Sequence, residues 1–294
     1  MIGFAFDRFE AQRERERVRV SAVSLRHAIL ATIVLAAWAA TVRANPPLVE
    51  LGIEGTWGAG SVEDVHAVLK SAAAQILPHC GPRRLAPIIV RPGTGAPISL
   101  YAKGPKGQYQ IELSARDKYW CQYAYQFAHE LGHLLSNYDR RKRGVNLWFE
   151  EALCDTASLV ALRGMAKSWR TAPPYRNWRD FSGSLESYAD RLLAQEHRRL
   201  PPDLTMPAWL TANLPELRKK RGLSPQSELV AAYLLPLFER DPALWQTLAW
   251  LNLGPQDAEA EFAEYLAGWH RRAPAEHRPR IEKIQALFGL GGTP

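Results

Sequence analysis

The first part of the chain combines short apolar runs with one amphipathic segment, a pattern that predicts strands around a single helix. The segment 61–77 has apolar positions three and four residues apart, as on one face of a helix. Ser61 comes before an acid, Asp64, at the third helical position, which is typical of a helix N-terminus. The apolar runs predict strands over 48–57, 85–90, 97–102 and 108–113, with the last two joined as a hairpin through the turn at 103–107.

Beyond residue 117 the apolar spacing becomes helical. Helices are expected over 117–135 and 147–163, the second capped by Asn146 and ended by Gly164. Further helices, separated by loops that contain proline, are predicted over 183–195, 225–239, 242–251 and 255–272. Strands that come first and helices that follow predict an α+β fold and not the regular alternation of a doubly wound sheet. We expect an α/β subdomain at 45–135 and a helical subdomain at 136–294.

Residues 1–44 differ from the rest of the chain. A polar, arginine-rich stretch at 1–27 is followed by an apolar run of fifteen residues at 28–42 and by the small-x-small pattern Val42-Arg43-Ala44. This order predicts a signal peptide that is cleaved after Ala44, with an uncleaved membrane anchor as the alternative. We therefore expect an exported protein, periplasmic or secreted, with possible membrane association through this segment.

Charge and cysteine content limit the partners of the exported part. Residues 45–294 hold 30 basic and 26 acidic residues, a balance too mild to favour nucleic-acid binding. An oxidising compartment would allow one disulfide among the three cysteines, and Cys80 with Cys121 is the expected pair. Because the sequence has no CxxC pair, a zinc site built from the cysteines is not expected.

The segment His129-Glu130-Leu131-Gly132-His133 places two histidines four residues apart on a predicted helix, so both project from one face. Two imidazole nitrogens at that spacing can reach one tetrahedral Zn²⁺, which lowers the pKa of water toward about 7. Glu130 is expected to be the general base that takes a proton from the attacking water and passes it to the leaving amine. Gly132 costs about 1 kcal/mol relative to alanine in a helix, which indicates that another backbone approaches there.

The next predicted helix supplies a third ligand. Glu151 lies eighteen residues after His133, and a short loop lets the two helices face each other across a metal ion. Asp155 is one helical turn after Glu151, and we expect it to accept the outer N–H of a ligand histidine. Glu150 is expected to fall on a different face of the helix and to pair with Cys154.

The segments HELGH at 129–133 and WFEEALCD at 148–155 resemble the gluzincins, the thermolysin-like and alanyl-aminopeptidase-like zinc peptidases. WFEE, together with PPYRNW at 173–178, also resembles a group of uncharacterised exported bacterial proteins. The resemblance implies a zincin-like fold, in which a small mixed sheet and an active-site helix precede a helical half. It also implies that the strand edge at 108–113 binds an extended peptide by strand addition, with Glu130 as base and Glu151 as ligand.

Two features of this sequence depart from the gluzincin pattern, and the milder one is that the glutamate helix carries Glu150 and Ala152 where aminopeptidase-like members usually have Asn and Gly. No G-x-M-E-N segment precedes the active-site helix, so the anchor that aminopeptidases use for a substrate amine is missing from the sequence. An acyl-transfer reaction needs a donor for its oxyanion, and among the tyrosines of the helical half we select Tyr175.

The expected function is that of an exported zinc metallohydrolase, a peptidase that acts on a peptide or protein substrate. The alternative is a catalytically silent zincin-like envelope protein that binds peptide or a protein partner. A zinc hydrolase of a non-peptide amide is a third possibility that the sequence leaves open.

Overall fold

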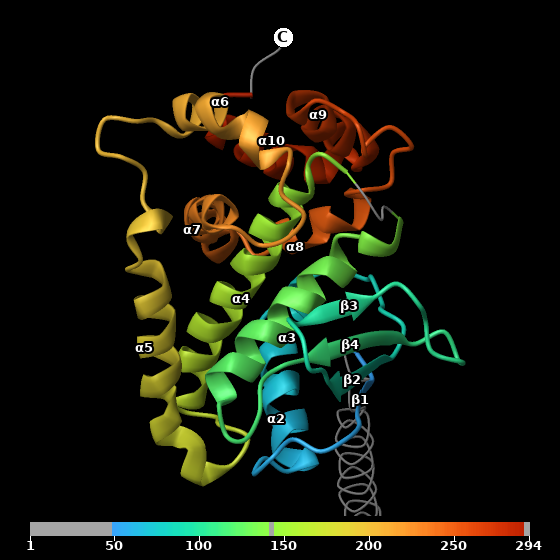
Figure 1. Ribbon diagram of the computed structural model, residues 1–294, viewed down its shortest axis with the longest axis vertical. Helices are drawn as coiled ribbons and strands as arrows, with labels where there is room; N and C mark the ends of the chain where they lie inside the picture. Colours follow the sequence, from blue (N-terminus) through green and yellow to red (C-terminus); the bar gives the residue numbers. More distant parts are fainter. Residues whose placement is uncertain (1–48, 141–143, 291–294) are drawn as a thin grey trace, which may run out of the picture. The chain divides into compact units, whose positions relative to one another are not determined.

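The computed structural model describes residues 49–140 and 144–290 of the chain. The predicted signal peptide or anchor at 1–44 lies outside the described residues. Residues 48–294 form one compact unit (Figure 1). Within the described ranges, no helix is both long enough and apolar enough to cross a membrane.

A small mixed sheet confirms the predicted strands, although each is shorter or shifted by a few residues. The strands are β1 (Leu51–Ile53), β2 (Ile88–Pro92), β3 (Ile98–Leu100) and β4 (Tyr109–Leu113). The spatial order is β1-β2-β4-β3; the first three run parallel, and β3 pairs antiparallel with β4 as the predicted hairpin. The fold is therefore α+β. Because β4 is paired on both sides, the prediction that 108–113 offers a free strand edge is wrong, and the edge strands are β1 and β3.

Two helices, α2 and α3, pack against this sheet, and α4 packs against both of them. Helix α2 (Val62–Ala73) begins as predicted at Ser61, whose hydroxyl accepts from Asp64 N at 3.0 Å. Helix α3 (Trp120–Leu135) packs against β3 and β4 on one side and against helix α4 (Leu147–Trp169) on another (Figure 1). Since α3 and α4 carry the HExxH segment and the predicted glutamate ligand, their contact determines the geometry of the candidate site.

Helix α4 differs from its prediction at both ends. It continues through Gly164 to Trp169, because the glycine packs against Gln75 and does not end the helix. A Cβ atom at position 164 would lie 2.5 Å from Gln75 Oε1, so glycine permits this contact. Asn146 precedes α4, but its side chain donates to Ala260 O at 2.9 Å and does not cap the helix.

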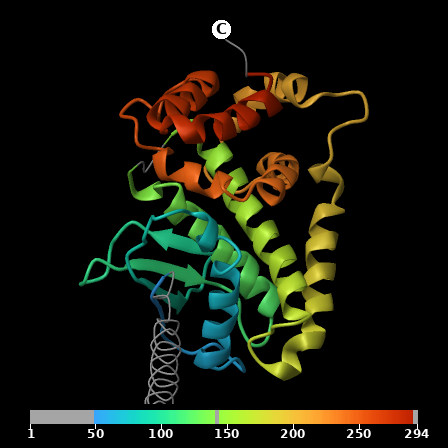
Figure 2. The same cartoon turned by 180° about the vertical axis from the view of Figure 1, so that it is seen from behind.

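The rest of the chain is helical and packs around α4 (Figure 2). The α-helices are α5 (Ser182–Leu193), α6 (Met206–Leu217), α7 (Pro225–Arg240), α8 (Leu244–Thr247), α9 (Phe262–Arg272) and α10 (Arg278–Leu287). Short 3-10 turns occur at Leu77–His79, Tyr138–Arg140, Arg176–Phe181, Glu196–Arg198, Leu248–Trp250 and Ala275–His277. Helices α6 and α10 were not predicted, and α9 begins later than the predicted 255.

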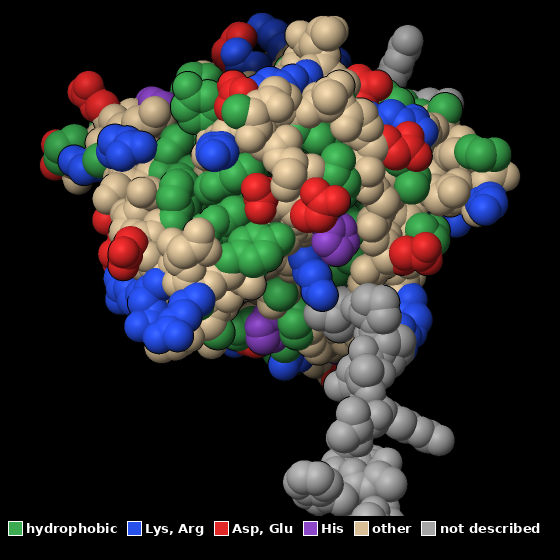
Figure 3. All heavy atoms as spheres, turned by 90° about the horizontal axis from the view of Figure 1, so that it is seen from below, with side chains coloured by type: hydrophobic (Ala, Val, Ile, Leu, Met, Phe, Trp, Pro, Cys, Tyr) green, Lys and Arg blue, Asp and Glu red, His purple; other side chains and the backbone are tan. Residues whose placement is uncertain are grey.

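The large aromatic residues of this half form its core. Trp148 and Phe149 at the start of α4 contact Phe262 of α9, with ring centroids 4.7 and 5.3 Å apart. Phe288 closes the cluster at 5.2 Å from Phe262. The first turn of α4 is thereby anchored to helices that lie more than a hundred residues later in the sequence. On the face shown in Figure 3, basic, acidic and hydrophobic side chains are intermixed.

The structure leaves Cys80, Cys121 and Cys154 as free thiols, so the predicted Cys80–Cys121 disulfide is wrong. Arg83, three residues after Cys80, donates to Leu135 O at the C-terminal end of α3. Cys121 lies in the first turn of α3. At a rise of 1.5 Å per residue the two ends of this helix are about 20 Å apart, whereas disulfide-bonded cysteines have Cα atoms within about 7 Å.

Candidate metal centre

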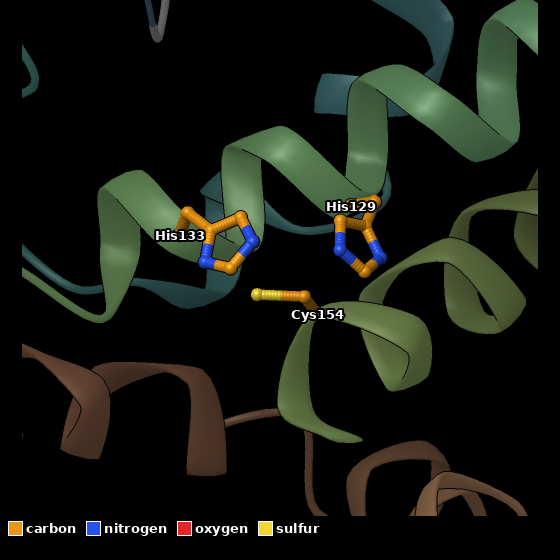
Figure 4. Close-up of side chains that lie close together, drawn as sticks. All are labelled: His129, His133 and Cys154. Atoms are coloured by element: carbon orange, nitrogen blue, oxygen red, sulfur yellow. The ribbon is translucent and has the colours of Figure 1, made fainter. Parts of the chain in front are cut away.

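The two histidines of α3 point together toward α4, with ring centroids 5.1 Å apart (Figure 4). His129 is nearly buried, with 9% of its surface exposed. Gly132 lies between them on the side of α4, where a Cβ atom would be only 2.8 Å from Cys154 Cα. The predicted close approach of a second backbone is confirmed, and the approaching backbone is that of the glutamate helix.

Glu151 is held between the two imidazole rings. Its Oε2 lies 3.1 Å from His129 Nε2, and its Oε1 lies 3.8 Å from His133 Nε2. Ligand atoms at about 2.0–2.2 Å from a tetrahedral zinc ion are themselves about 3.3 Å apart, so these distances are those of donors around one ion. Burial alone would raise the pKa of Glu151, but the hydrogen bond from His129 and the charge of His133 outweigh burial and lower it. The carboxylate is therefore anionic. Two imidazole nitrogens with one carboxylate oxygen are a donor set that zinc accepts.

Cys154 joins the same cluster from below. The ligand atoms of His129, His133 and Cys154 all lie within 4.8 Å of one another, so this group could hold a metal ion (Figure 4). A zinc site built from the cysteines was not expected from the sequence, yet Cys154 lies in this group. The helical spacing of three residues between Glu151 and Cys154 is the signal that could have revealed it.

The two possible third donors differ in environment. Glu151 lines the cleft that opens over the histidines, and Cys154 is fully buried beneath them. Burial raises the pKa of the Cys154 thiol to about 12, against the lowering effect of His133. The thiol is thus neutral near pH 7 unless a metal ion displaces its proton.

Glu150, and not Asp155, contacts the Nδ1 side of the His133 ring. Glu150 Oε1 lies 2.8 Å from His133 Nδ1, and its Oε2 accepts from Asn252 Nδ2 at 2.7 Å. The prediction that Asp155 takes this position is therefore wrong. Burial disfavours protonation of His133, but Cys154 and Glu150 beside it outweigh burial and raise its pKa well above the usual value.

The antiparallel packing of α3 and α4 explains this exchange of roles. Asp155 lies one turn further along α4 and faces the earlier turn of α3, where Tyr125 OH donates to its Oδ1 at 2.5 Å. Its Oδ2 accepts from Arg198 Nη1 at 2.5 Å, and both side chains of this ion pair are completely buried. Asp155 is thus neutralised by Arg198 and does not bond to a histidine.

Glu130 lies on the cleft beside the histidines, as predicted. It is 2% exposed, and its Oε2 has no hydrogen-bond partner among the described residues. A buried carboxylate oxygen without a partner costs free energy unless a water molecule or an ion satisfies it. The residues therefore fit a zinc ion bound by the two imidazole nitrogens and a Glu151 oxygen, with a water molecule beside Glu130 Oε2.

The cleft has a volume of about 920 Å³ and two different walls. Ile98 and Ser99 of the edge strand β3 form one wall, and Ser99 Oγ donates to Glu130 O at 3.3 Å. Arg221, Leu223 and Glu259 lie on the other. The edge strand is therefore coupled directly to the helix that carries the predicted base.

Tyr175 is not among the residues that the structure brings to this cleft. It lines a separate groove beside Val62 and His66 of α2, and its ring packs edge-on against Trp178 at 4.8 Å. The tyrosines that do line the cleft include Tyr125 and Tyr138. Both hydroxyl groups donate to protein oxygens, the first to Asp155 and the second to Leu100 O at 2.6 Å.

No protein-family model matches the chain, and neither a curated protein nor a solved structure matches it.

Proposed function

We propose that the protein is an exported zinc-dependent peptidase in which His129, His133 and Glu151 bind the metal ion and Glu130 is the general base. The observation that carries this proposal is the Glu151 carboxylate, 3.1 and 3.8 Å from the two Nε2 atoms. Glu130 lines the same cleft, and its buried Oε2 has no hydrogen-bond partner among the described residues. The resemblance of HELGH and WFEEALCD to the gluzincins supports the same assignment.

Glu151 is the better third ligand for catalysis because of where it lies. Catalytic zinc sites keep a coordination position open to substrate, whereas structural sites are closed by four protein ligands. With Glu151 as third ligand the open position faces the cleft. With Cys154 added, the four donors would close the site and leave no position for substrate.

In the proposed reaction, zinc, Glu130 and strand β3 have different roles. Zinc, when bound, supplies Lewis-acid polarisation of the scissile carbonyl and acidifies water. Glu130 takes a proton from the attacking water and delivers it to the leaving nitrogen. The edge of β3 binds the substrate backbone in an extended conformation through main-chain hydrogen bonds, the role that the sequence assigned to 108–113.

A second candidate is the silent zincin-like protein that binds peptide or a partner around a structural zinc. The observation in its favour is Cys154, whose thiol could hold a metal ion together with both histidines. The two candidates differ in what Cys154→Ala does. The variant keeps zinc and activity in a catalytic site, and it loses much of its zinc affinity in a closed one.

The test combines metal content with peptide cleavage. We expect one zinc ion per chain by elemental analysis of the purified protein, and cleavage of a broad peptide library by the zinc-loaded protein. Glu130→Gln should retain zinc, and its cleavage rate should fall by a factor of at least about 10². Glu264→Gln makes the same change at an exposed position of α9, and its zinc content and cleavage rate should equal those of the wild type. Absence of zinc would overturn the metal centre, and equal cleavage by Glu130→Gln would overturn the catalytic role.

A further inference from the structure

We propose that Asn252 is a positioning residue for the metal centre: it holds Glu150, and Glu150 fixes the His133 ring with Nε2 directed at the metal. The inference rests on the proposed function, because it assumes that His133 is a ligand. It concerns a residue more than a hundred positions away from the HExxH and glutamate segments.

A continuous chain of hydrogen bonds carries the inference. Tyr265 OH donates to Asn252 Oδ1 at 2.7 Å, Asn252 Nδ2 donates to Glu150 Oε2 at 2.7 Å, and Glu150 Oε1 lies 2.8 Å from His133 Nδ1. All of the polar groups between α9 and the ligand histidine are sealed from solvent: Asn252 is 2% exposed, Glu150 2% and Tyr265 0%. Buried links of this kind have one arrangement and do not exchange with water.

The chemistry of these groups determines the direction of each bond. Asn252 Nδ2 faces two oxygen acceptors, Glu150 and Ser136 O at 2.8 Å, so the amide nitrogen must lie on that side and the amide oxygen must face the Tyr265 hydroxyl. Glu150 Oε1 lies 2.8 Å from His133 Nδ1, so Nδ1 is the ring nitrogen that Glu150 holds. Nε2 is then the nitrogen directed toward Glu151 Oε1, 3.8 Å away, where a metal ion would bind.

The backbone at Asn252 favours asparagine at this position. Its φ of 59° is left-handed, a conformation that asparagine tolerates better than other residues with side chains. A second asparagine, Asn137, has φ of 56° and holds the same segment, since its Nδ2 donates to the carbonyl oxygens of residues 248, 249 and 251. Asn137 thus docks the segment on the end of α3, and Asn252 connects the segment to Glu150.

This pair of asparagines provides a matched experiment. Asn252→Gly removes the amide and keeps the left-handed backbone free of strain, and Asn137→Gly does the same at a position that docks the segment without contacting Glu150. Asn252→Asp keeps the shape but places a second carboxylate against Glu150. Tyr265→Phe keeps the buried ring and removes only the donor to Asn252, so it remains informative if the Asn252 variants fold poorly.

The measured quantities are zinc affinity, by competition with a chromophoric chelator, and the visible spectrum of the Co²⁺-substituted protein. We expect Asn252→Gly and Asn252→Asp to bind zinc about 10–100-fold more weakly than the wild type, as for loss of other groups that orient a metal ligand. Tyr265→Phe should weaken binding by about fivefold, the effect of one neutral hydrogen bond. The Co²⁺ spectrum should change for the Asn252 variants and stay the same for Asn137→Gly, whatever its melting temperature.

The outcomes separate the two proposals. If the wild type binds zinc at one per chain but Asn252→Gly and Tyr265→Phe bind it within twofold of the wild type, the positioning role is overturned and the metal centre stands. The same conclusion follows if Asn137→Gly weakens zinc as much as Asn252→Gly, because the effect would then come from docking of the segment. If the wild type binds no zinc, the proposed function fails and the inference fails with it.

Discussion

Gly132→Ala tests whether the contact between α3 and α4 sets the geometry of the metal centre. In an isolated helix this change would stabilise by about 1 kcal/mol, because alanine has the higher helix propensity. In the protein, the added Cβ would lie 2.8 Å from Cys154 Cα and 3.0 Å from Cys154 Sγ. The first of these atoms belongs to the backbone of α4 and cannot rotate away.

The size of the effect follows from that distance. Carbon atoms pack at about 3.5–4.0 Å, so the two helices would have to separate by about 0.7 Å or more where they cross. Overpacking of a core contact typically costs about 1–3 kcal/mol, and a backbone clash belongs in the upper part of that range. After subtraction of the helix-propensity gain, we expect a net destabilisation of about 1–2 kcal/mol, or a decrease in Tm of roughly 2–8 °C. Zinc must draw the helices together again, which lowers its affinity roughly tenfold.

The assay is urea denaturation of the metal-free protein together with zinc competition titration. Gly183→Ala is the matched control, because Gly183 also lies in a helix, α5, but a Cβ atom added there would have no neighbouring atom within 4 Å. The control should be unchanged or stabilised by up to about 1 kcal/mol, with unaltered zinc affinity. A Gly132→Ala protein as stable as this control, with wild-type zinc affinity, would refute the reasoning.

Three further predictions rest on burial, thiol chemistry and metal linkage. Arg198→Ala should lower the free energy of unfolding, measured by urea denaturation, by about 3–5 kcal/mol, because Asp155 would be left buried without a counter-charge. The control Arg170→Ala breaks an exposed ion pair and should lower it by less than about 1 kcal/mol. Equal losses in the two variants would contradict the buried-charge argument. Burial raises the pKa of Cys80 to about 12 and of Cys121 to about 11, so both thiols are neutral at pH 8. Both should react slowly with iodoacetamide until denaturant exposes them, and fast reaction of these two thiols in the native protein would contradict the argument. Zinc at a hundred times its dissociation constant should stabilise the native protein by about 2.7 kcal/mol, seen as a higher Tm that EDTA reverses.

The sequence predicted those parts of the molecule that depend on local patterns. Ser61 with Asp64 marks a helix start that needs only neighbouring residues, and the histidine spacing is a property of one helix. Gly132 also gave a correct prediction, because a glycine inside an apolar helix has few explanations other than close packing. The expectation that α3 and α4 face each other relied on a short loop between them, and the structure confirms it.

The remainder depended on register and on contacts between distant segments. Which of Glu150 and Asp155 contacts a histidine depends on the packing register of α4 against α3. That register cannot be predicted from the residue pattern of either helix. Gly164 was taken as a helix end because glycine commonly has that role, but its packing partner Gln75 lies far away in the sequence. Asn252 had no motif of any kind, and only the folded chain brings it to Glu150.

The separation in sequence between these groups has a consequence for how the protein matures. His129 and Glu151 are 22 residues apart, whereas Glu150 and Asn252 are 102 residues apart. Closing the longer loop costs more chain entropy, so contacts of that range form later than local ones. If His129, His133 and Glu151 bind a metal ion as proposed, a growing chain can bring these donors together as soon as α3 and α4 have been synthesised. It can fix the His133 ring through Asn252 only when the segment before α9 has docked. Chains that end before this segment would then hold the ion loosely, which would couple tight metal binding to completion of the polypeptide.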